Sequence, residues 1–310
     1  MRKQAVFVLA IVVLFIVTPW ACESAFAGQI VAWGNNSYGQ CDVPAGNDFV
    51  AIAGGGSHSL ALKSDGSLAA WGNNTYGQCD VPAGNDFAAI AGGSCHSLAL
   101  RSNGSLVAWG NNGDGQCNVP AGSDFVAIAC GSRHNLALKS DGSLAASGNN
   151  TYGQCDVPVG NDFVRIAGGF WHSSAFRADG SAVAWGWNRN RHYVPPGNNF
   201  ALVVSGGFHN LALNLDGSLV AWGWNEYHQC DVPEGNDFVA IACGSQHNLA
   251  LKSDATAGAW GWSEYNQFDE PVGRDFVATV RGWKHGLALV REPATLLLLS
   301  LAAVMLRRRR

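Results

Sequence analysis

Charged side chains are scarce in this chain of 310 residues. Asp, Glu, Lys and Arg together make up 14% of the sequence. Six of the 19 basic residues lie at the extreme ends, so residues 28–291 contain 13 basic and 21 acidic side chains. Because nucleic-acid binding depends on clustered Lys and Arg, this acidic body argues against nucleic acid as a partner.

Several signals of fibres and enzymes are also missing. The 39 glycines follow no Gly-X-Y period, which excludes collagen. The sequence holds no Cys-x-x-Cys, no nucleophile-elbow serine, no phosphate-binding loop and no pair of acids placed as general acid and base. Most acids lie in Asp-Gly pairs or before apolar stretches, where turns are common. We therefore predict that the protein is not an enzyme, with no catalytic residues, no metal and no cofactor.

The N-terminal segment predicts export. Arg2 and Lys3 precede an apolar run over residues 5–17, and Ala25-Phe26-Ala27 forms an A-x-A cleavage pattern. A basic start, an apolar run and small residues at a cleavage site are the parts of a secretory signal peptide. We assign residues 1–27 to such a peptide.

The C-terminal segment, residues 292–310, combines Pro293, an apolar run over 296–306 and four arginines. The run is short for a bilayer helix, which needs about 20 residues, and the arginines fit a cytoplasmic end. This order resembles the PEP-CTERM sorting tail, although Arg291 stands where that motif has its first proline. The resemblance implies processing by an exosortase-type protease and delivery to the cell surface or matrix of a Gram-negative-type bacterium, after transient anchoring in the inner membrane. A plain C-terminal anchor helix is the alternative.

A repeat of 37 or 38 residues fills the chain between these ends. Trp-Gly marks six units, and Ser147-Gly148 takes its place in the remaining one. A histidine keeps the same interval: His58, His96, His134, His172, His209, His247 and His285. Internal repetition at this period is typical of propellers and solenoids, and here it defines seven units.

Each unit alternates short apolar stretches with turn residues and lacks the 3.6-residue apolar period of a helix. Asp65-Gly66 separates two such stretches and is a strong hairpin signal that recurs in most units. We therefore predict a small antiparallel sheet per unit, with strands a, b and c and a short fourth strand d that ends at a proline such as Pro82.

Seven small sheets around an axis make a β-propeller, whereas an open stack would need polar capping repeats, and none is visible. The body begins with a strand c (Ile30–Trp33) and ends with a strand a (Phe276–Val280) and a strand b (His285–Val290). The two ends could thus complete one blade. We predict an all-β, seven-bladed propeller over residues 28–291, closed by a blade shared between the termini.

The pattern Gly-x-x-His-Ser-Leu-Ala-Leu-x-x-Asp-Gly-x-x-x-x-Trp-Gly-x-Asn-x-x-Gly-Gln, clearest from Gly55 to Gln78, resembles the RCC1 repeat. The resemblance covers residues 30–290. The short units are similar to a bacterial form of the family that includes secreted β-lactamase inhibitory propellers. It implies action by binding, either nucleotide exchange on a small GTPase or blocking of an enzyme, although a fold alone does not fix a function. Export argues against a GTPase partner.

The repeated histidines and cysteines are predicted to be structural. Equivalent atoms of neighbouring blades are too far apart to share a metal ion at about 2 Å, so we expect packed imidazoles that bond to backbone at the start of strand b. Five cysteines share one slot that is aromatic in the other two units, which predicts apolar packing and mostly free thiols; they are Cys41, Cys79, Cys117, Cys155 and Cys230.

Two variable positions are expected on one face of the propeller. One precedes each histidine in the a–b loop, and the other is the second residue after each Trp-Gly tryptophan in the c–d loop. Successive strands alternate in direction, so both loop sets lie at the same end of the blades. Aromatic side chains with arginine are typical of binding hot spots, although some rings could instead pack between blades. The candidate binding residues are Arg133, Phe170, Trp171, Trp187, Phe208, Trp224, Tyr227, Trp262, Trp283 and Lys284.

These observations predict an exported, surface-associated module that binds an unknown protein or glycan through its a–b and c–d loops. Membrane contact is expected only through the terminal segments. An exosortase-type protease is expected as the partner that processes the C-terminal tail. Two alternatives stay open. The protein could inhibit an extracellular enzyme, or it could be a propeller hydrolase or lyase with converging acids or a metal on the axis.

Overall fold

The fold is that of a computed structural model, which describes residues 27–187, 194–197, 199–254, 256–263 and 276–291. The predicted tail and nearly all of the predicted signal peptide lie outside these residues. Within them, no helix is long and apolar enough to cross a membrane. Regular structure in the described part of the chain consists of 21 β-strands.

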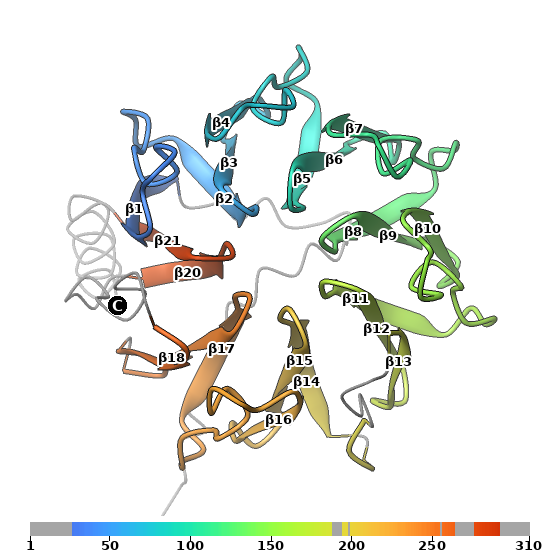
Figure 1. Ribbon diagram of the computed structural model, residues 1–310, viewed down its shortest axis with the longest axis vertical. Helices are drawn as coiled ribbons and strands as arrows, with labels where there is room; N and C mark the ends of the chain where they lie inside the picture. Colours follow the sequence, from blue (N-terminus) through green and yellow to red (C-terminus); the bar gives the residue numbers. More distant parts are fainter. Residues whose placement is uncertain (1–26, 188–193, 198, 255, 264–275, 292–310) are drawn as a thin grey trace, which may run out of the picture.

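The strands form seven blades around an axis, with strand a innermost and strand c towards the rim (Figure 1). The a strands are β2 (Phe49–Gly54), β5 (Phe87–Gly92), β8 (Phe125–Cys130), β11 (Phe163–Gly168), β14 (Phe200–Ser205), β17 (Phe238–Cys243) and β20 (Phe276–Arg281). The b strands are β3 (His58–Lys63), β6 (His96–Arg101), β9 (His134–Lys139), β12 (His172–Arg177), β15 (His209–Asn214), β18 (His247–Lys252) and β21 (His285–Arg291). The c strands are β4 (Leu68–Gly72), β7 (Leu106–Gly110), β10 (Leu144–Gly148), β13 (Ala182–Gly186), β16 (Leu219–Gly223), β19 (Ala257–Gly261) and β1 (Gly28–Gly34). The predicted all-β, seven-bladed propeller is confirmed.

The first strand of the body lies beside the last one. β1 pairs antiparallel with β21 from Gly28 opposite Arg291 to Gly34 opposite His285, so strands from both ends of the body share one sheet (Figure 1). A single pair, Gly28 with Phe49, also links β1 to β2 of the next blade. This is the pairing that a blade divided between the two ends requires. Because strand b runs away from the a–b loops, both ends of the body lie at the side of the b–c turns.

The apolar core lies between neighbouring blades. Strand b is buried over five consecutive residues in each blade, and its central leucines, such as Leu60 and Leu98, are at most 1% exposed. In the six blades where its side chain is described, the phenylalanine that begins strand a packs against the preceding blade, as Phe87 does against Leu62. Burial on both faces explains why strand b is a near-continuous apolar run and does not alternate with polar residues.

The predicted fourth strand d is wrong. In the five blades where the structure describes it, the segment after strand c consists of turns, because its own side chains bond its backbone groups. Asn74 Oδ1 accepts from the N–H of Cys79 at 2.8 Å, Gln78 Oε1 accepts from Tyr76 at 2.9 Å, and Gly77 accepts from Asp80 at 3.0 Å. Pro82 has no N–H to offer a ladder. A strand partner would have to break these local bonds.

Each repeated histidine is buried, as predicted, but in six of the seven, Nε2 bonds a side chain of the next blade, where a bond to backbone was expected. His58 Nε2 lies 3.0 Å from Ser97 Oγ, and His96 Nε2 lies 2.8 Å from Asn135 Oδ1. The same geometry joins His134 to Ser173, His172 to Asn210, His209 to Asn248 and His285 to Ser59. Thus six described blade-to-blade boundaries carry one imidazole bridge each.

The partners fix the tautomer of the imidazole. Asn135 Oδ1 can only accept, so His96 donates from Nε2. Ser97 Oγ donates its proton to the carbonyl of Gln78 at 2.8 Å and therefore accepts from His58. Glycine three residues before the histidine makes room for the ring, because a Cβ on Gly55 would lie 2.1 Å from His58 Cε1. The Gly-x-x-His pattern is therefore a packing requirement.

The residue that receives the imidazole varies together with the end of strand a. Serine occurs where strand a ends in glycine, as in Gly92 with Ser97. Asparagine occurs where strand a ends in a side chain that donates to its Oδ1, as in Cys130 with Asn135 at 3.3 Å and Ser205 with Asn210 at 2.7 Å. The last residue of strand a and the acceptor of the imidazole thus occupy the same space between blades in either combination. The polar atoms of the acceptor are hydrogen-bonded in both.

The eight cysteines of the described residues are free thiols. The five that share one slot are half-buried and donate to backbone, as Cys79 Sγ does to the carbonyl of Asn73 at 3.3 Å. Burial, with a smaller contribution from the adjacent aspartate, raises the pKa of Cys41, Cys79 and Cys155 to about 11. These thiols are therefore protonated at neutral pH and react slowly.

Acid is expected to weaken the blade contacts. Burial, followed by the charge of neighbouring histidines, lowers the pKa of His58 and His134 to about 3, against about 6.5 in an unfolded chain. The unfolded chain thus binds protons first as the pH falls. The contribution of these histidines to the free energy of unfolding is fully present above pH 6.5. Below that pH, each of them should lower the free energy of unfolding by about 1.4 kcal/mol per pH unit. Urea unfolding at pH 7, 6 and 5 measures this fall, and a constant free energy of unfolding would contradict it.

A double-mutant cycle tests the paired packing. Asn135→Ser leaves the Cys130 thiol without its acceptor, and Cys130→Gly leaves a gap beside Asn135, so each change should destabilise the protein by about 1–2 kcal/mol. The double variant restores the Gly/Ser pair that other blades use. It should therefore lose at least about 0.5 kcal/mol less than the sum of the single losses. Additive losses in urea unfolding would argue that the two positions are independent.

Candidate functional site

The a–b and c–d loops lie on the same face, because backbone hydrogen bonds join them. The N–H of Trp187 donates to the carbonyl of Trp171 at 2.8 Å, and Trp224 donates to Phe208 at 2.9 Å. Asn35 donates to Lys284 in the same way at 2.9 Å. The two variable positions of each blade are therefore held next to each other, and substitution at one changes the surroundings of the other.

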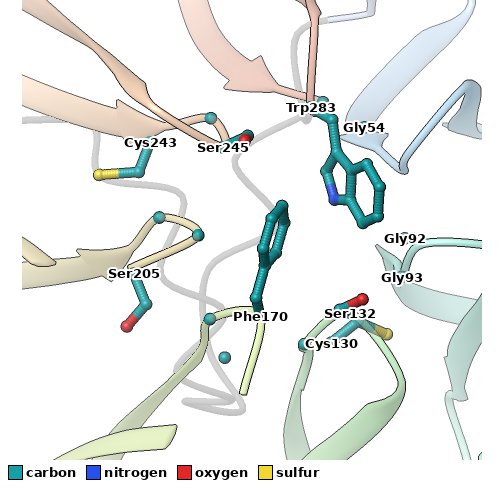
Figure 2. A pocket seen from close by; sticks show the side chains of 17 residues that line it. Gly54, Gly92, Gly93, Cys130, Ser132, Phe170, Ser205, Cys243, Ser245 and Trp283 are labelled. Carbon is teal, nitrogen blue, oxygen red and sulfur yellow. The ribbon is translucent and has the colours of Figure 1, made fainter. Parts of the chain in front are cut away.

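Near the axis, the a–b loops bond to each other from blade to blade. Examples are Gly56 N–H to the carbonyl of Gly93 at 3.0 Å and Phe170 N–H to that of Gly207 at 3.0 Å. Two of these loops carry rings at the innermost position, and Figure 2 shows Phe170 and Trp283 side by side there, with centroids 4.6 Å apart. They cover the axis on this face.

The rings on this face form one continuous group of contacts. From the axis outward, Phe170 contacts Phe208 at a centroid distance of 5.3 Å, and Phe208 contacts Trp171 at 5.4 Å, Trp187 at 5.2 Å and Trp224 at 5.8 Å. Most of the contacts are edge-to-face or tilted, as aromatic pairs prefer.

The group continues towards the seventh blade. Trp224 contacts Tyr227 at 5.0 Å, and Tyr227 contacts Trp262 at 6.1 Å. Lys284 Nζ lies 5.8 Å from the centroid of Trp262. The structure thus brings together nine of the ten residues that the sequence singled out.

Sequence reasoning missed Tyr152, which contacts Trp171 at 5.4 Å and Trp187 at 6.4 Å. It occupies the same c–d loop slot as Tyr38, Tyr76 and Tyr227, and these four rings are 38–58% exposed. Because tyrosine fills this slot in several units, a comparison between units does not single out Tyr152. We call the ten residues Tyr152, Phe170, Trp171, Trp187, Phe208, Trp224, Tyr227, Trp262, Trp283 and Lys284 the aromatic surface.

Arg133, the tenth predicted residue, lines a cavity together with some of these rings. Its side chain is 61% exposed, and its guanidinium lies 3.4 Å from the carboxylate of Asp114, which also accepts from Asn149 Nδ2 at 2.8 Å. The cavity has a volume of about 440 Å³ and is called the hollow below. Five rings of the aromatic surface line it, together with the polar residues Ser94, Ser132, Arg133, Asn149 and Thr151.

A second, smaller cavity of about 140 Å³ lies near the axis, and Phe170 and Trp283 are among the residues that line it (Figure 2). Loop glycines and the side chains of Cys130, Ser205 and Cys243 line it. Among the described residues, no carboxylate or imidazole lines this cavity, and no three His, Cys, Asp or Glu side chains are grouped to hold a metal ion. The converging acids that a propeller hydrolase or lyase would need are thus not found in the part of the axis that the structure describes.

The sequence matches the family described as "Regulator of chromosome condensation (RCC1) repeat" over residues 49–78, 87–116, 125–154, 200–229 and 238–267. These matches run from strand a into the c–d loop of five units. No curated protein matches the chain.

Several solved structures share the fold. Prp20p from Saccharomyces cerevisiae, studied for its binding to Gsp1p and histones, is 20% identical with a TM-score of 0.73, covering 87% of this chain and 93% of that one. Human WBSCR16 is 18% identical with a TM-score of 0.71, covering 86% and 100%. The ectodomain of the Physcomitrella patens receptor kinase CR4 is 22% identical with a TM-score of 0.66, covering 78% and 70%. Five of the seven units thus match the RCC1 repeat, and the chain shares the propeller fold of these structures.

Proposed function

We propose that this protein is an exported, non-enzymatic binding module that holds a protein partner on its aromatic surface. The observation that carries the proposal is the gathering of nine rings from several blades on one face, most of them half-buried. Tryptophan and tyrosine contribute large contact areas at a small cost in side-chain entropy, and they dominate binding hot spots.

The contacts among these rings leave surface for a partner. Tyr152 and Tyr227 remain 44% and 38% exposed, although both take part in ring contacts. Rings that packed only to stabilise the blades would be buried like Phe49 and Phe238, which are 0% and 3% exposed. Packing of the rings on each other also reduces the entropy that binding would cost, because the side chains are already ordered.

Comparison between units favours a specific role for this face. In four blades the c–d position holds Asn35, Asn73, Asn111 and Asn149, and in the other three it holds Trp187, Trp224 and Trp262. Since asparagine satisfies the fold at this position, the tryptophans are not needed for the blade itself. Prp20p, of the same fold, is described by its binding to proteins, which supports a protein as the partner.

The placement of the ends of the body suits a surface-exposed module. Gly28 and Arg291 lie opposite each other at the side of the b–c turns. If the predicted tail anchors the chain, the aromatic surface points away from the membrane. Inhibition of an extracellular enzyme, the alternative suggested by the short repeats, would be one instance of such binding.

Replacing Trp187, Trp224 and Trp262 together by asparagine tests the proposal. The full chain and the triple variant are produced with export, immobilised and exposed to extracellular proteins of the producing cells, and retained proteins are then titrated individually. Removing three hot-spot rings should weaken the binding of a retained partner at least tenfold. Urea unfolding should be unchanged, because other blades carry asparagine in this slot.

Leu215→Ser is the matched control, because Leu215 is 75% exposed in a b–c turn on the opposite face. It removes an exposed apolar side chain without touching the aromatic surface, and it should bind the partner like the parent protein. Equal binding by the triple variant and the parent protein would exclude these three rings from the interface.

A further inference from the structure

We infer that the hollow is a separate binding site for an uncharged carbohydrate. The hollow lies between the axis and the rim, and its volume of about 440 Å³ falls within the roughly 300–1,000 Å³ typical of small-ligand sites. The site goes beyond the proposed protein-binding function, because none of the three tryptophans that test that function lines it. Its chemistry follows from the two kinds of side chain that line it.

Five of the residues that line the hollow are aromatic. Phe170, Trp171, Phe208 and Trp283 come from the a–b loops of three blades, and Tyr152 comes from a c–d loop. Contacts among them at 4.6–5.4 Å fix their positions relative to each other. A ring face carries partial negative charge and attracts weakly positive C–H groups. These rings can therefore accept a ligand that presents a flat face of C–H bonds.

The other residues that line the hollow offer hydrogen bonds. Ser132 and Thr151 bring hydroxyl groups, for which the described structure shows no side-chain hydrogen bond, and Arg133 uses a single long contact of 3.4 Å to Asp114. The carboxamide of Asn149 is already committed, since it bonds Asp114, Gln154 and the N–H of Thr151. A lining that combines rings with hydrogen-bonding groups suits a ligand that has an apolar face and hydroxyl groups.

Charge decides between a neutral and an acidic ligand. Arg133 is the one ionised side chain that lines the hollow in the described structure, and Asp114 balances it at 3.4 Å. The surrounding body is acidic, with 21 acidic against 13 basic side chains. An anionic ligand would meet a neutralised guanidinium in a negative field, whereas a sugar hydroxyl can both accept from Arg133 and donate to an oxygen. A pyranose without a carboxylate or phosphate therefore suits both the rings and the hydrogen-bonding side chains of the hollow.

The experiment titrates the full chain with soluble hexasaccharides of glucose, xylose, mannose, galactose and N-acetylglucosamine, and with a hexasaccharide of galacturonic acid. Tryptophan fluorescence and calorimetry report binding. We expect saturable binding of at least one neutral hexasaccharide, with a dissociation constant that changes less than twofold between 0.05 and 0.5 M salt, because no net charge is neutralised. Binding of none of the five neutral sugars, or at least tenfold preference for the uronate, would overturn the inference.

Matched variants locate the site. Tyr152→Ala and Trp171→Ser should each weaken sugar binding at least tenfold. The fold tolerates serine in place of Trp171, since Ser57 is the equivalent residue in another unit. Tyr76→Ala, the equivalent of Tyr152 in another unit and 53% exposed outside the hollow, should bind like the parent protein. Equal loss in Tyr76→Ala and Tyr152→Ala, with unchanged unfolding, would place the sugar elsewhere on the face.

The variant Trp224→Asn with Trp262→Asn separates this inference from the proposed function, since neither ring lines the hollow. It should keep sugar binding while weakening the protein partner. If instead Trp171→Ser loses the protein partner and the parent protein binds no sugar, the hollow receives a side chain of that partner. The carbohydrate inference then fails while the proposed function stands.

Discussion

The hydrogen bond from a buried imidazole to the next blade is the contact on which the propeller depends most directly. Each imidazole lies at the start of a strand b, and in six of the seven the acceptor is the second residue of the neighbouring strand b, usually 39 residues away. The same acceptor residue bonds the carbonyl of Gln78 or its equivalent in the preceding c–d loop. One side chain therefore fixes a neighbouring blade and the loop that leads into its own blade.

This arrangement separates what must be constant from what can vary. The glycine that makes room for the ring, the histidine and its acceptor are constrained by close contact within and between blades. The residue just before the histidine points away from these contacts, and the units fill it with side chains as different as Ser57, Arg133 and Trp171. The aromatic surface and the hollow are both built from such unconstrained positions, so a binding face can change without loss of the blades.

The sequence was sufficient for most of the fold, because the 38-residue interval and the Asp-Gly turns are local signals. Strand d was predicted wrongly, since Cys79-Asp80-Val81-Pro82 has the composition of an edge strand, and the competing bonds from Asn74 and Gln78 are visible only in three dimensions. The histidine acceptor was missed for a related reason. Identifying Ser97 as the partner of His58 requires the stagger between two blades, which no short segment encodes.

The candidate site was predictable where units differ and not where they agree. Strand alternation placed Trp187 and Trp224 correctly on the face of the a–b loops, and the structure groups them with Phe208. Tyr152 gave no such signal, because tyrosine fills the same slot in several units and so did not distinguish one half of the ring. The hollow depends on ring orientation and on the Arg133–Asp114 contact, and neither is a property of the sequence pattern.

The pairing of β1 with β21 has a mechanical consequence. Gly28 and Arg291 are directly opposite each other at one end of an antiparallel pair, and six further residue pairs follow behind them. The hydrogen bonds of such a pair run perpendicular to the strands. A force that separates the two ends of the body therefore pulls along these bonds and breaks them one after another, as in the opening of a zipper. A force parallel to the strands would act on all seven residue pairs at once. The β1–β21 pairing therefore resists a force applied at Gly28 and Arg291 less than it resists a force along the strands.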